Sequence, residues 1–132
     1  MGHSSEVANA MVRFYEAFAE GTAEAFDRIV FMVPDVMAIG TDPKEQLDDR
    51  DAWQGGFMSL PGITMEAGDI QGFRQDGVGW IVDRPTFSLP DGRRLRTRLT
   101  AVACEEDDGC KLVHLHVSVA VPDEVALAEA SA

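Results

Sequence analysis

The sequence lacks the features that would place it at once in a familiar functional class. It has no run of about 18 apolar residues, which a membrane-spanning helix would need. It also has no Gly-rich phosphate loop, no GxSxG elbow, no HExxH pair and no set of protein-kinase motifs. These absences argue against P-loop nucleotide hydrolysis, elbow-type serine hydrolysis and zincin or kinase chemistry. The remaining candidates for chemistry are single polar residues in apolar settings.

Basic residues are scarce. The chain has 11 Lys and Arg against 23 Asp and Glu, which gives a net charge of −12 at pH 7. A field of this sign repels a phosphate backbone, so nucleic acid is not an expected partner. The first residues lack the basic and apolar stretches of a signal peptide, and we expect a cytoplasmic protein without a membrane partner.

Cysteine is limited to Cys104 and Cys110, with five residues between them. That gap is neither the two-residue spacing of a redox motif nor half of a zinc knuckle. Two interpretations are open, namely two reduced thiols or a bridge across neighbouring strands.

The composition predicts one domain with a single core. The 132 residues are 45% hydrophobic, which suffices for one core but not for two. We expect one domain over residues 1–132, with flexible ends at 1–5 and 123–132.

Helical patterns fill the first part of the chain. Apolar residues at helical spacing predict a helix over 6–20 that ends at Gly21, followed by a Thr22-capped helix over 23–29. A third helix is predicted over 49–59, with Trp53 and Phe57 facing inward. Between the second and third helices, residues 30–39 predict a bend or an edge strand, because Pro34-Asp35 interrupts them.

Extended patterns follow from residue 63 onward. Four strands are predicted, over 63–73, 78–89, 93–105 and 111–121, with turns at Asp76-Gly77, Pro90-Asp91-Gly92 and 106–109. Helices followed by an antiparallel meander are typical of an α+β fold.

The last two strands carry one polar face. Arg96, Arg98 and Thr100 share a face of the first strand, and His114, His116 and Ser118 share a face of the second. No carboxylate lies at matching phase on either strand, so we expect no metal site and no cofactor here. This face is predicted to meet solvent or a second subunit.

Two further residues are candidates for catalysis. Tyr15, the only tyrosine, lies beside the apolar stripe of the first helix, where its hydroxyl could donate into a cavity or face solvent. Asp42 precedes Pro43 at the end of the first extended segment. Half desolvated at the mouth of a strand, its carboxylate could act as a general base, whereas a surface Asp-Pro pair starts a turn.

The order of these elements resembles that of the nuclear transport factor 2-like superfamily, in its SnoaL-like and ketosteroid-isomerase-like branch. The resemblance covers nearly the whole chain and rests on the order and spacing of four segments, at 14–18, 40–43, 79–83 and 111–118. It implies a cone-shaped, mostly antiparallel curved sheet that wraps three N-terminal helices around an apolar pocket.

The resemblance also implies functional residues. Tyr15 would be an oxyanion donor and Asp42 a base, while the position of the third catalytic group is Ala101, which can donate nothing. A hydrophobic small molecule would be bound by nine residues: Trp53, Phe57, Trp80, Val82, Leu99, Ala101, Val113, Leu115 and Val117.

On the same resemblance, Arg98, His114, His116 and Ser118 lie on the convex side and form a homodimer interface. The resulting hypothesis is a small-molecule-binding protein that works as an isomerase or cyclase. The alternatives are a non-catalytic binding or assembly module, and an orphan domain whose cavity is filled by its own side chains.

Overall fold

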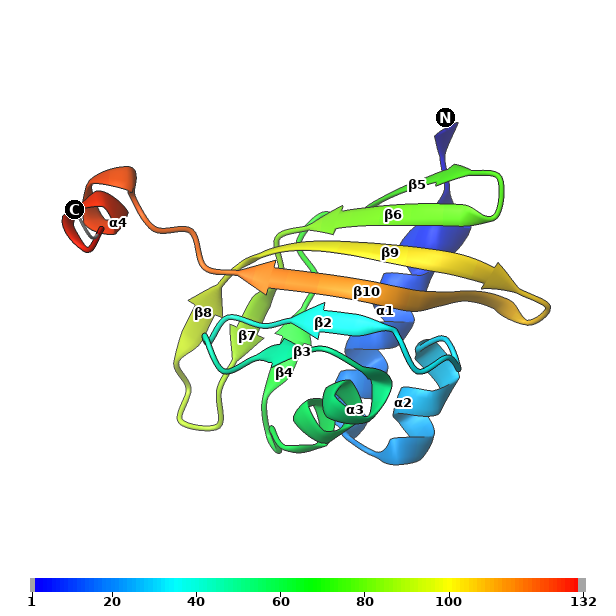
Figure 1. Cartoon of the computed structure of the whole chain (residues 1–132), viewed down its shortest axis with the longest axis horizontal. Helices are drawn as coiled ribbons and strands as arrows, with labels where there is room; N and C mark the ends of the chain where they lie inside the picture. Colours follow the sequence, from blue (N-terminus) through cyan, green and yellow to red (C-terminus); the bar gives the residue numbers. More distant parts are fainter. Residues whose placement is uncertain (1, 131–132) are drawn as a thin grey trace.

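The computed structural model describes residues 2–130, in which three helices cover one face of a curved, open sheet (Figure 1). The helices are α1 (Ser5–Glu20), α2 (Ala23–Ile29) and α3 (Arg50–Met58). A short fourth helix, α4 (Asp123–Ala128), lies apart from them near the C-terminus. The α+β fold expected from the sequence is confirmed.

The main layer is a seven-stranded sheet in the order β1-β5-β6-β9-β10-β2-β3. Every neighbouring pair is antiparallel except β2 and β10, which run parallel. The bounds are β1 (Gly2–His3), β2 (Met37–Ile39), β3 (Gln46–Leu47), β5 (Gln71–Gln75), β6 (Val78–Asp83), β9 (Arg98–Glu106) and β10 (Gly109–Ser118). The predicted turn at 106–109 joins β9 to β10.

A second, three-stranded sheet corrects the expected meander of four unbroken strands. It consists of β4 (Thr64–Glu66), β7 (Thr86–Ser88) and β8 (Arg94–Arg96). Three of the predicted strands therefore bend and divide between the two sheets. Two of the bends are joined, because both the backbone N–H and the hydroxyl of Thr97 donate to the carbonyl of Pro85, at 3.1 and 2.8 Å.

Capping residues set the helix ends, and two of them, Gly21 and Thr22, were predicted from the sequence. Gly21 ends α1 in the left-handed region at φ 66°, where glycine carries no side-chain penalty. The Thr22 hydroxyl accepts from the N–H of Ala25 at 3.1 Å and caps α2. Asp49 caps α3 in the same way, through the N–H of Ala52 at 2.8 Å.

Two glycines let α1 lie close against the sheet. A Cβ on Gly72 would come within 2.5 Å of the backbone nitrogen of Ala8, and one on Gly79 within 2.7 Å of Val7. Any larger residue at these positions would push α1 away from β5 and β6. The apolar stripe of α1 is therefore pressed against the sheet and buried.

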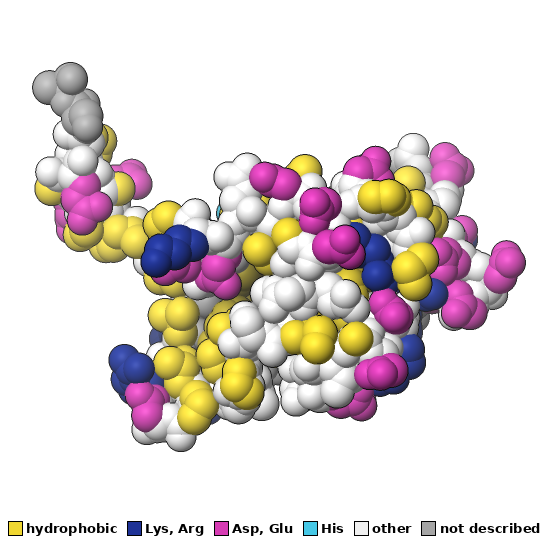
Figure 2. Space-filling model, turned by 60° about the horizontal axis from the view of Figure 1, so that its bottom comes forward, with side chains coloured by type: hydrophobic (Ala, Val, Ile, Leu, Met, Phe, Trp, Pro, Cys, Tyr) yellow, Lys and Arg dark blue, Asp and Glu magenta, His cyan; other side chains and the backbone are white. Residues whose placement is uncertain are grey.

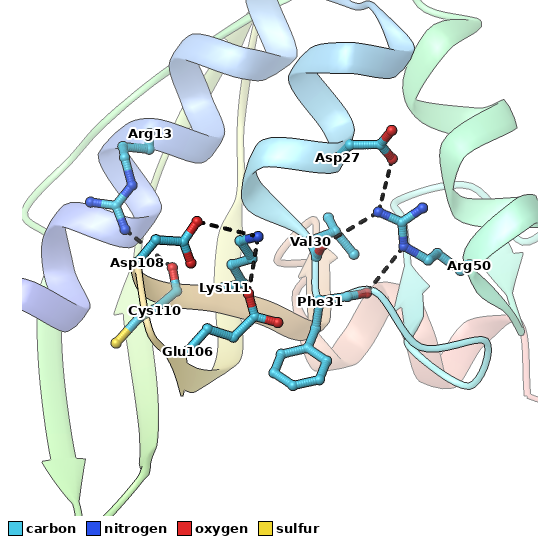
Figure 3. Close-up of polar contacts among 9 residues, drawn as sticks. All are labelled: Arg13, Asp27, Val30, Phe31, Arg50, Glu106, Asp108, Cys110 and Lys111. Carbon is cyan, nitrogen blue, oxygen red and sulfur yellow. Dashed lines mark hydrogen bonds and ion pairs between the residues drawn. The ribbon is translucent and has the colours of Figure 1, made fainter.

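Polar contacts join the helices to one another and to the β9–β10 hairpin (Figure 3). The guanidinium of Arg50 donates to the carbonyl of Phe31 at 3.1 Å and to Asp27 at 3.0 Å, which joins α3 to α2. Arg13 on α1 donates to the carbonyl of Cys110 at 3.1 Å. These contacts fix α2 and α3 beside the pocket described below.

The sheet has an inner face against the helices and an outer face away from them. On β9, Leu99, Ala101 and Ala103 are buried on the inner face, and Arg98 and Thr100 are exposed on the outer one. A bulge in β10 between Leu112 and His114 shifts the alternation by one residue. Leu115 and Val117 beyond it are buried on the inner face.

Candidate ligand-binding pocket

A hollow lies between α1, α3 and the inner face of the sheet, and is referred to here as the apolar pocket. Twelve of its lining residues are apolar: Phe14, Phe18, Ala38, Ile39, Leu47, Trp53, Phe57, Leu60, Met65, Phe87, Leu115 and Val117. Gly40, Thr41, Glu45 and Gly56 complete the lining. A concave apolar surface with few polar groups is typical of small-molecule sites.

Aromatic contacts fix one wall of the apolar pocket. Phe57 on α3 meets Phe18 and Phe14 on α1 edge-on, with ring centroids 5.7 and 6.0 Å apart. Phe26 on α2 contacts Phe57 and Trp53 from behind, at 5.2 and 5.7 Å. Edge-to-face pairs of this kind stabilise each ring in one orientation, so the wall is preformed.

The apolar pocket is narrow. The hollow and its mouth enclose about 510 Å³, but only about 60 Å³ of that space is wide enough to admit the centre of a water molecule. Drug-sized ligands occupy pockets of roughly 300–1,000 Å³. As it stands, the pocket fits only a small or slender molecule. Leu47, Leu60 and Phe87 are only half-buried, so their side chains can move aside.

Among the residues that the structure describes, two polar side chains line the apolar pocket. They belong to Thr41 and Glu45, both partly exposed. One carboxylate oxygen of Glu45 already accepts a hydrogen bond from the backbone N–H of Asp42, at 2.9 Å. The lining within residues 2–130 thus offers no histidine, cysteine or buried carboxylate to a bound molecule.

The predicted base Asp42 lies outside the pocket. Its side chain is exposed, and its Oδ1 accepts from the backbone N–H of Lys44 at 2.9 Å. This is the turn-forming contact that an Asp-Pro pair favours. Thr41, its neighbour in the chain, does line the pocket. The segment that follows β2 therefore borders the pocket, whereas the carboxylate of Asp42 does not.

The predicted donor Tyr15 is buried and points elsewhere. Its hydroxyl donates to Oδ2 of Asp83 at 2.6 Å, and the two residues are only 6% and 2% exposed. Burial, together with the hydrogen bond and the negative charge of Asp83, raises the pKa of the Tyr15 phenol far above its ordinary value. Tyr15 is therefore a protonated donor to Asp83. The structure does not bring Tyr15 and Asp42 together.

Asp83 is the polar residue that the sequence reasoning missed. It ends β6 at the inner face, where it also accepts from the backbone N–H of Gly68 at 3.1 Å. The position of Asp83 in the sequence could have indicated that it faces inward, because Asp83 follows Gly79 and Ile81 at alternate positions of one strand. A carboxylate two residues beyond a buried isoleucine must find a donor.

The nine predicted ligand-binding residues separate into four that line the pocket, three that lie elsewhere on or beside the inner face, and two that lie on the outer face. Trp53, Phe57, Leu115 and Val117 line the apolar pocket. Leu99 and Ala101 are buried on the inner face, and Val113 is half-buried at the β10 bulge, but none of the three lines the pocket.

Trp80 and Val82 require a correction, because they lie on the outer face. Trp80 stacks on Phe73 with centroids 5.6 Å apart, and Val82 is 42% exposed. The inner positions of β6 are Gly79, Ile81 and Asp83. The placement of Trp80 and Val82 inside the pocket came from the family resemblance, and the burial of β6 shows the opposite alternation.

The residues predicted for the convex side do lie on the outer face. Arg98 and His116 are exposed, and Ser118 is half-buried. His114 is half-buried, with Nδ1 3.0 Å from the carbonyl oxygen of Met37. Since that oxygen can only accept, Nδ1 carries the proton.

Other kinds of site find little support in residues 2–130. No group of three or more His, Cys, Asp or Glu side chains there is placed to hold a metal ion. Within the same residues, no helix is both long and apolar enough to span a bilayer. Cys104 points to the outer side of β9 and Cys110 to the inner side of β10, and both are free thiols.

Comparison with solved structures shows the same fold in many proteins. A nuclear transport factor 2-like protein of unknown function from Pseudomonas putida KT2440 superposes with a TM-score of 0.76 at 15% identity, covering 94% of each chain. A calcium/calmodulin-dependent protein kinase II hub from S. rosetta gives 0.71 at 21% identity, covering 91% of this chain and 98% of the hub. A putative ketosteroid isomerase from Shewanella frigidimarina gives 0.68 at 16% identity, covering 87% and 96%.

Sequence comparison is more specific. No curated protein matches the sequence. The family model of the SnoaL-like domain matches residues 7–122, from the first buried residue of α1 to the proline before α4. The match includes every strand from β2 to β10 and all the residues of the apolar pocket. This chain therefore belongs to the SnoaL-like domain family, and it shares its fold with nuclear transport factor 2-like proteins.

Proposed function

We propose that this chain binds a small apolar molecule in the apolar pocket and acts as a binding module. The observation that carries the proposal is the chemistry of the lining, which is aromatic and aliphatic apart from Thr41 and Glu45. Burying apolar ligand surface contributes roughly 25 cal/mol per Å², so a ligand can bind here without a charged anchor. Its binding energy would come from contact with rings that are already fixed.

The catalytic use of Asp42 and Tyr15 stays a prediction, and the geometry gives it no support. A general base must reach the proton it removes within about 3 Å or through one water. Asp42 is exposed and hydrogen-bonded to its own turn, while the Tyr15 hydroxyl is donated to Asp83. A ligand in the apolar pocket would meet neither group.

We also propose that the chain forms a homodimer through its outer face. Val78 and Val82 are exposed there beside the half-buried Trp80, and the polar residues Arg98 and His116 lie on neighbouring strands. Apolar side chains with polar neighbours on one face are typical of an interface. Sedimentation at micromolar concentration should give a dimer, and a monomer would contradict this part of the proposal.

Ligand binding can be read from Trp53, which lines the apolar pocket. The chain has two tryptophans, so Trp80→Phe leaves Trp53 as the only one. Titration of this variant with naphthalene, a small planar apolar probe, should change the Trp53 emission in a saturable way with one site per chain. The probe tests the pocket and does not stand for the natural ligand.

A matched pair of substitutions locates the site. Val117→Phe places a larger side chain in the pocket lining, and should weaken probe binding by about tenfold or more, because one added ring fills much of the free space. Val78→Phe makes the same change on the outer face and should leave affinity within about twofold. Equal effects of the two variants, or no saturable signal, would contradict the proposal.

A further inference from the structure

The C-terminal arm, residues 119–130, is exposed along its whole length. It leaves the end of β10 and carries α4 away from the body (Figures 1 and 2). None of its residues is buried, and it exposes four large apolar side chains, those of Val119, Val121, Val125 and Leu127, the last at 71%. A six-residue helix is not stable alone in water. The arm therefore has the character of a segment that folds against a partner.

The charge of the arm has one sign. It carries Asp123, Glu124 and Glu129 and no lysine or arginine. The match to the SnoaL-like family ends at residue 122, so α4 and its acidic residues lie beyond the part of the chain that the family shares.

A basic groove lies on the outer face, where β6 and β10 end and β9 begins. The outer groove has about 370 Å³ of space wide enough to admit the centre of a water molecule, and the side chains along it are those of Val82, Arg84, Arg98, Thr100, His116 and Ser118. Asp83 and Leu99 border it too, but their side chains are buried on the inner side. Within residues 2–130, neither Arg84 nor Arg98 forms an ion pair, although acidic residues outnumber basic ones two to one in this chain.

We propose that the outer groove binds the acidic arm of a second copy of this chain. Asp123 and Glu124 would pair with the free guanidinium groups of Arg84 and Arg98, through the charge-assisted hydrogen bonds that arginine forms with carboxylates. Val125, on the same short helix, would cover the exposed Val82 at the edge of the groove.

The position where the arm begins favours a second copy over the same chain. Ser118 is the last residue of β10 and borders the outer groove, so the arm begins at the groove and then points away from the body. The four residues before α4, 119–122, can span about 13 Å when extended. They carry the acidic residues away from their own groove and toward a neighbour. Two chains could exchange arms about a two-fold axis, with each arm in the other's groove.

This inference rests on the proposed homodimer and adds the contact that would hold it together. Charge reversal provides a test in the full-length chain. The groove variant is Arg84→Glu with Arg98→Glu, and the arm variant is Asp123→Lys with Glu124→Lys. All four residues are exposed, so the fold should survive both changes. Each variant alone should raise the dimer dissociation constant by about tenfold or more, because like charges then meet at both contacts.

An equimolar mixture of the two variants should restore dimerisation. In a heterodimer each arm meets a groove of opposite charge, so the dissociation constant should return to within about threefold of that of the unmodified chain. The control is Arg28→Glu with Lys44→Glu, which changes the net charge as much as the groove variant does, at exposed positions outside the groove. Analytical ultracentrifugation of each sample and of the mixture gives the readout.

Four outcomes would overturn the inference. If both variants dimerise as tightly as the control, the arm lies elsewhere, while the homodimer proposal survives. If only the groove variant loses the dimer, the groove binds some other acidic group. If both weaken and the mixture does not recover, the arm binds its own chain. If the unmodified chain is a monomer, both the exchange and the dimer fail, and the Trp53 titration still tests the apolar pocket separately.

Discussion

The two faces of the seven-stranded sheet differ along every central strand. On β9 the inner positions, Leu99 and Ala101, are 1% exposed, whereas Arg98 and Thr100 between and beside them lie open on the outer face. The inner face covers a core and one wall of the apolar pocket. The outer face carries arginines, histidines and hydroxyls around a groove. The proposed ligand-binding pocket and the proposed dimer surface thus lie on opposite faces of one sheet.

The inner face also holds a polar pair, and the side chains of both residues already have hydrogen-bond partners. Tyr15 and Asp83 are hydrogen-bonded to each other, and Asp83 also accepts from Gly68. Within residues 2–130, no buried side-chain nitrogen or oxygen lacks a hydrogen-bond partner. The two faces therefore differ in their polar groups. Those of the inner face already have hydrogen-bond partners, whereas those of the outer face are exposed and can bind a partner.

The largest expected contrast comes from adjacent residues of β9. Leu99→Ala removes a buried side chain and leaves a cavity, and should lower the free energy of unfolding by about 2–5 kcal/mol. Thr100→Ala, one residue further on, should change it by less than about 0.5 kcal/mol. Urea denaturation of the two variants measures the contrast. Similar losses would mean that the faces are not as different as the structure indicates.

Removing the Tyr15 hydroxyl should have the next largest effect. Tyr15→Phe keeps the ring and leaves the buried Asp83 carboxylate without that donor, which should cost about 1–3 kcal/mol of unfolding free energy. The control is the double variant Tyr15→Phe with Asp83→Leu, which removes both polar partners. Gly68 is an exposed residue, so its N–H can then bond to water, and this variant should be no less stable than Tyr15→Phe. A Tyr15→Phe variant as stable as the unmodified chain would show that the Tyr15–Asp83 hydrogen bond does not stabilise the fold.

At alkaline pH, the stability that Tyr15 provides relative to phenylalanine should decrease. The pKa of Tyr15 is raised in the folded chain above its unfolded value of about 10, so its contribution is complete below pH ~10 and is lost as pH rises further. The difference in unfolding free energy between the unmodified chain and Tyr15→Phe should shrink by about 1.4 kcal/mol per pH unit above that point.

Comparing the unmodified chain with Tyr15→Phe also cancels the effects of other titrating groups. Burial and the neighbouring Glu6 raise the pKa of the Cys110 thiol, but this shift occurs in both proteins and cancels in the difference. A difference that stays constant from pH 9 to pH 11 would contradict the buried hydrogen bond.

The smallest expected effect is that of Asp42→Asn. The amide oxygen of asparagine can still accept from the N–H of Lys44, so the turn is kept. Unfolding free energy should change by less than about 0.5 kcal/mol, and naphthalene affinity should not change. A loss of binding would place Asp42 in the site and revive its catalytic role. Isothermal denaturation and the Trp53 titration together measure both quantities.

Much of the fold could be predicted from the sequence because local signals agreed with tertiary packing. The helices over 6–20 and 23–29 were correct within one residue, since Gly21 and Thr22 set their ends. The predicted third helix over 49–59 differs from α3 only by its flanking residues. The breaks at residues 67–70 and Arg84-Pro85 were missed, although Gly68 and Pro85 are local signals for a strand break.

The roles of the candidate residues were harder to predict because they depend on contacts between distant segments. Tyr15 and Asp83 are 68 positions apart, and only the fold shows that one binds the other. The family resemblance placed Trp80 and Val82 on the wrong face. The inward positions of β6 hold Gly79 and Asp83, and each of these contacts α1. Trp53 and Phe57 were easier, since their helical spacing pointed both rings inward.

The central claim is that a small apolar molecule binds on the inner face, and methyl NMR tests it most directly. Leu115 and Val117 line the apolar pocket, while Val78 and Val82 carry methyl groups on the outer face of the same sheet. On titration with naphthalene, the methyl signals of Leu115 and Val117 should shift in a saturable way, and those of Val78 and Val82 should stay in place. Shifts centred on Val78 and Val82, or none at any of the four residues, would contradict the account.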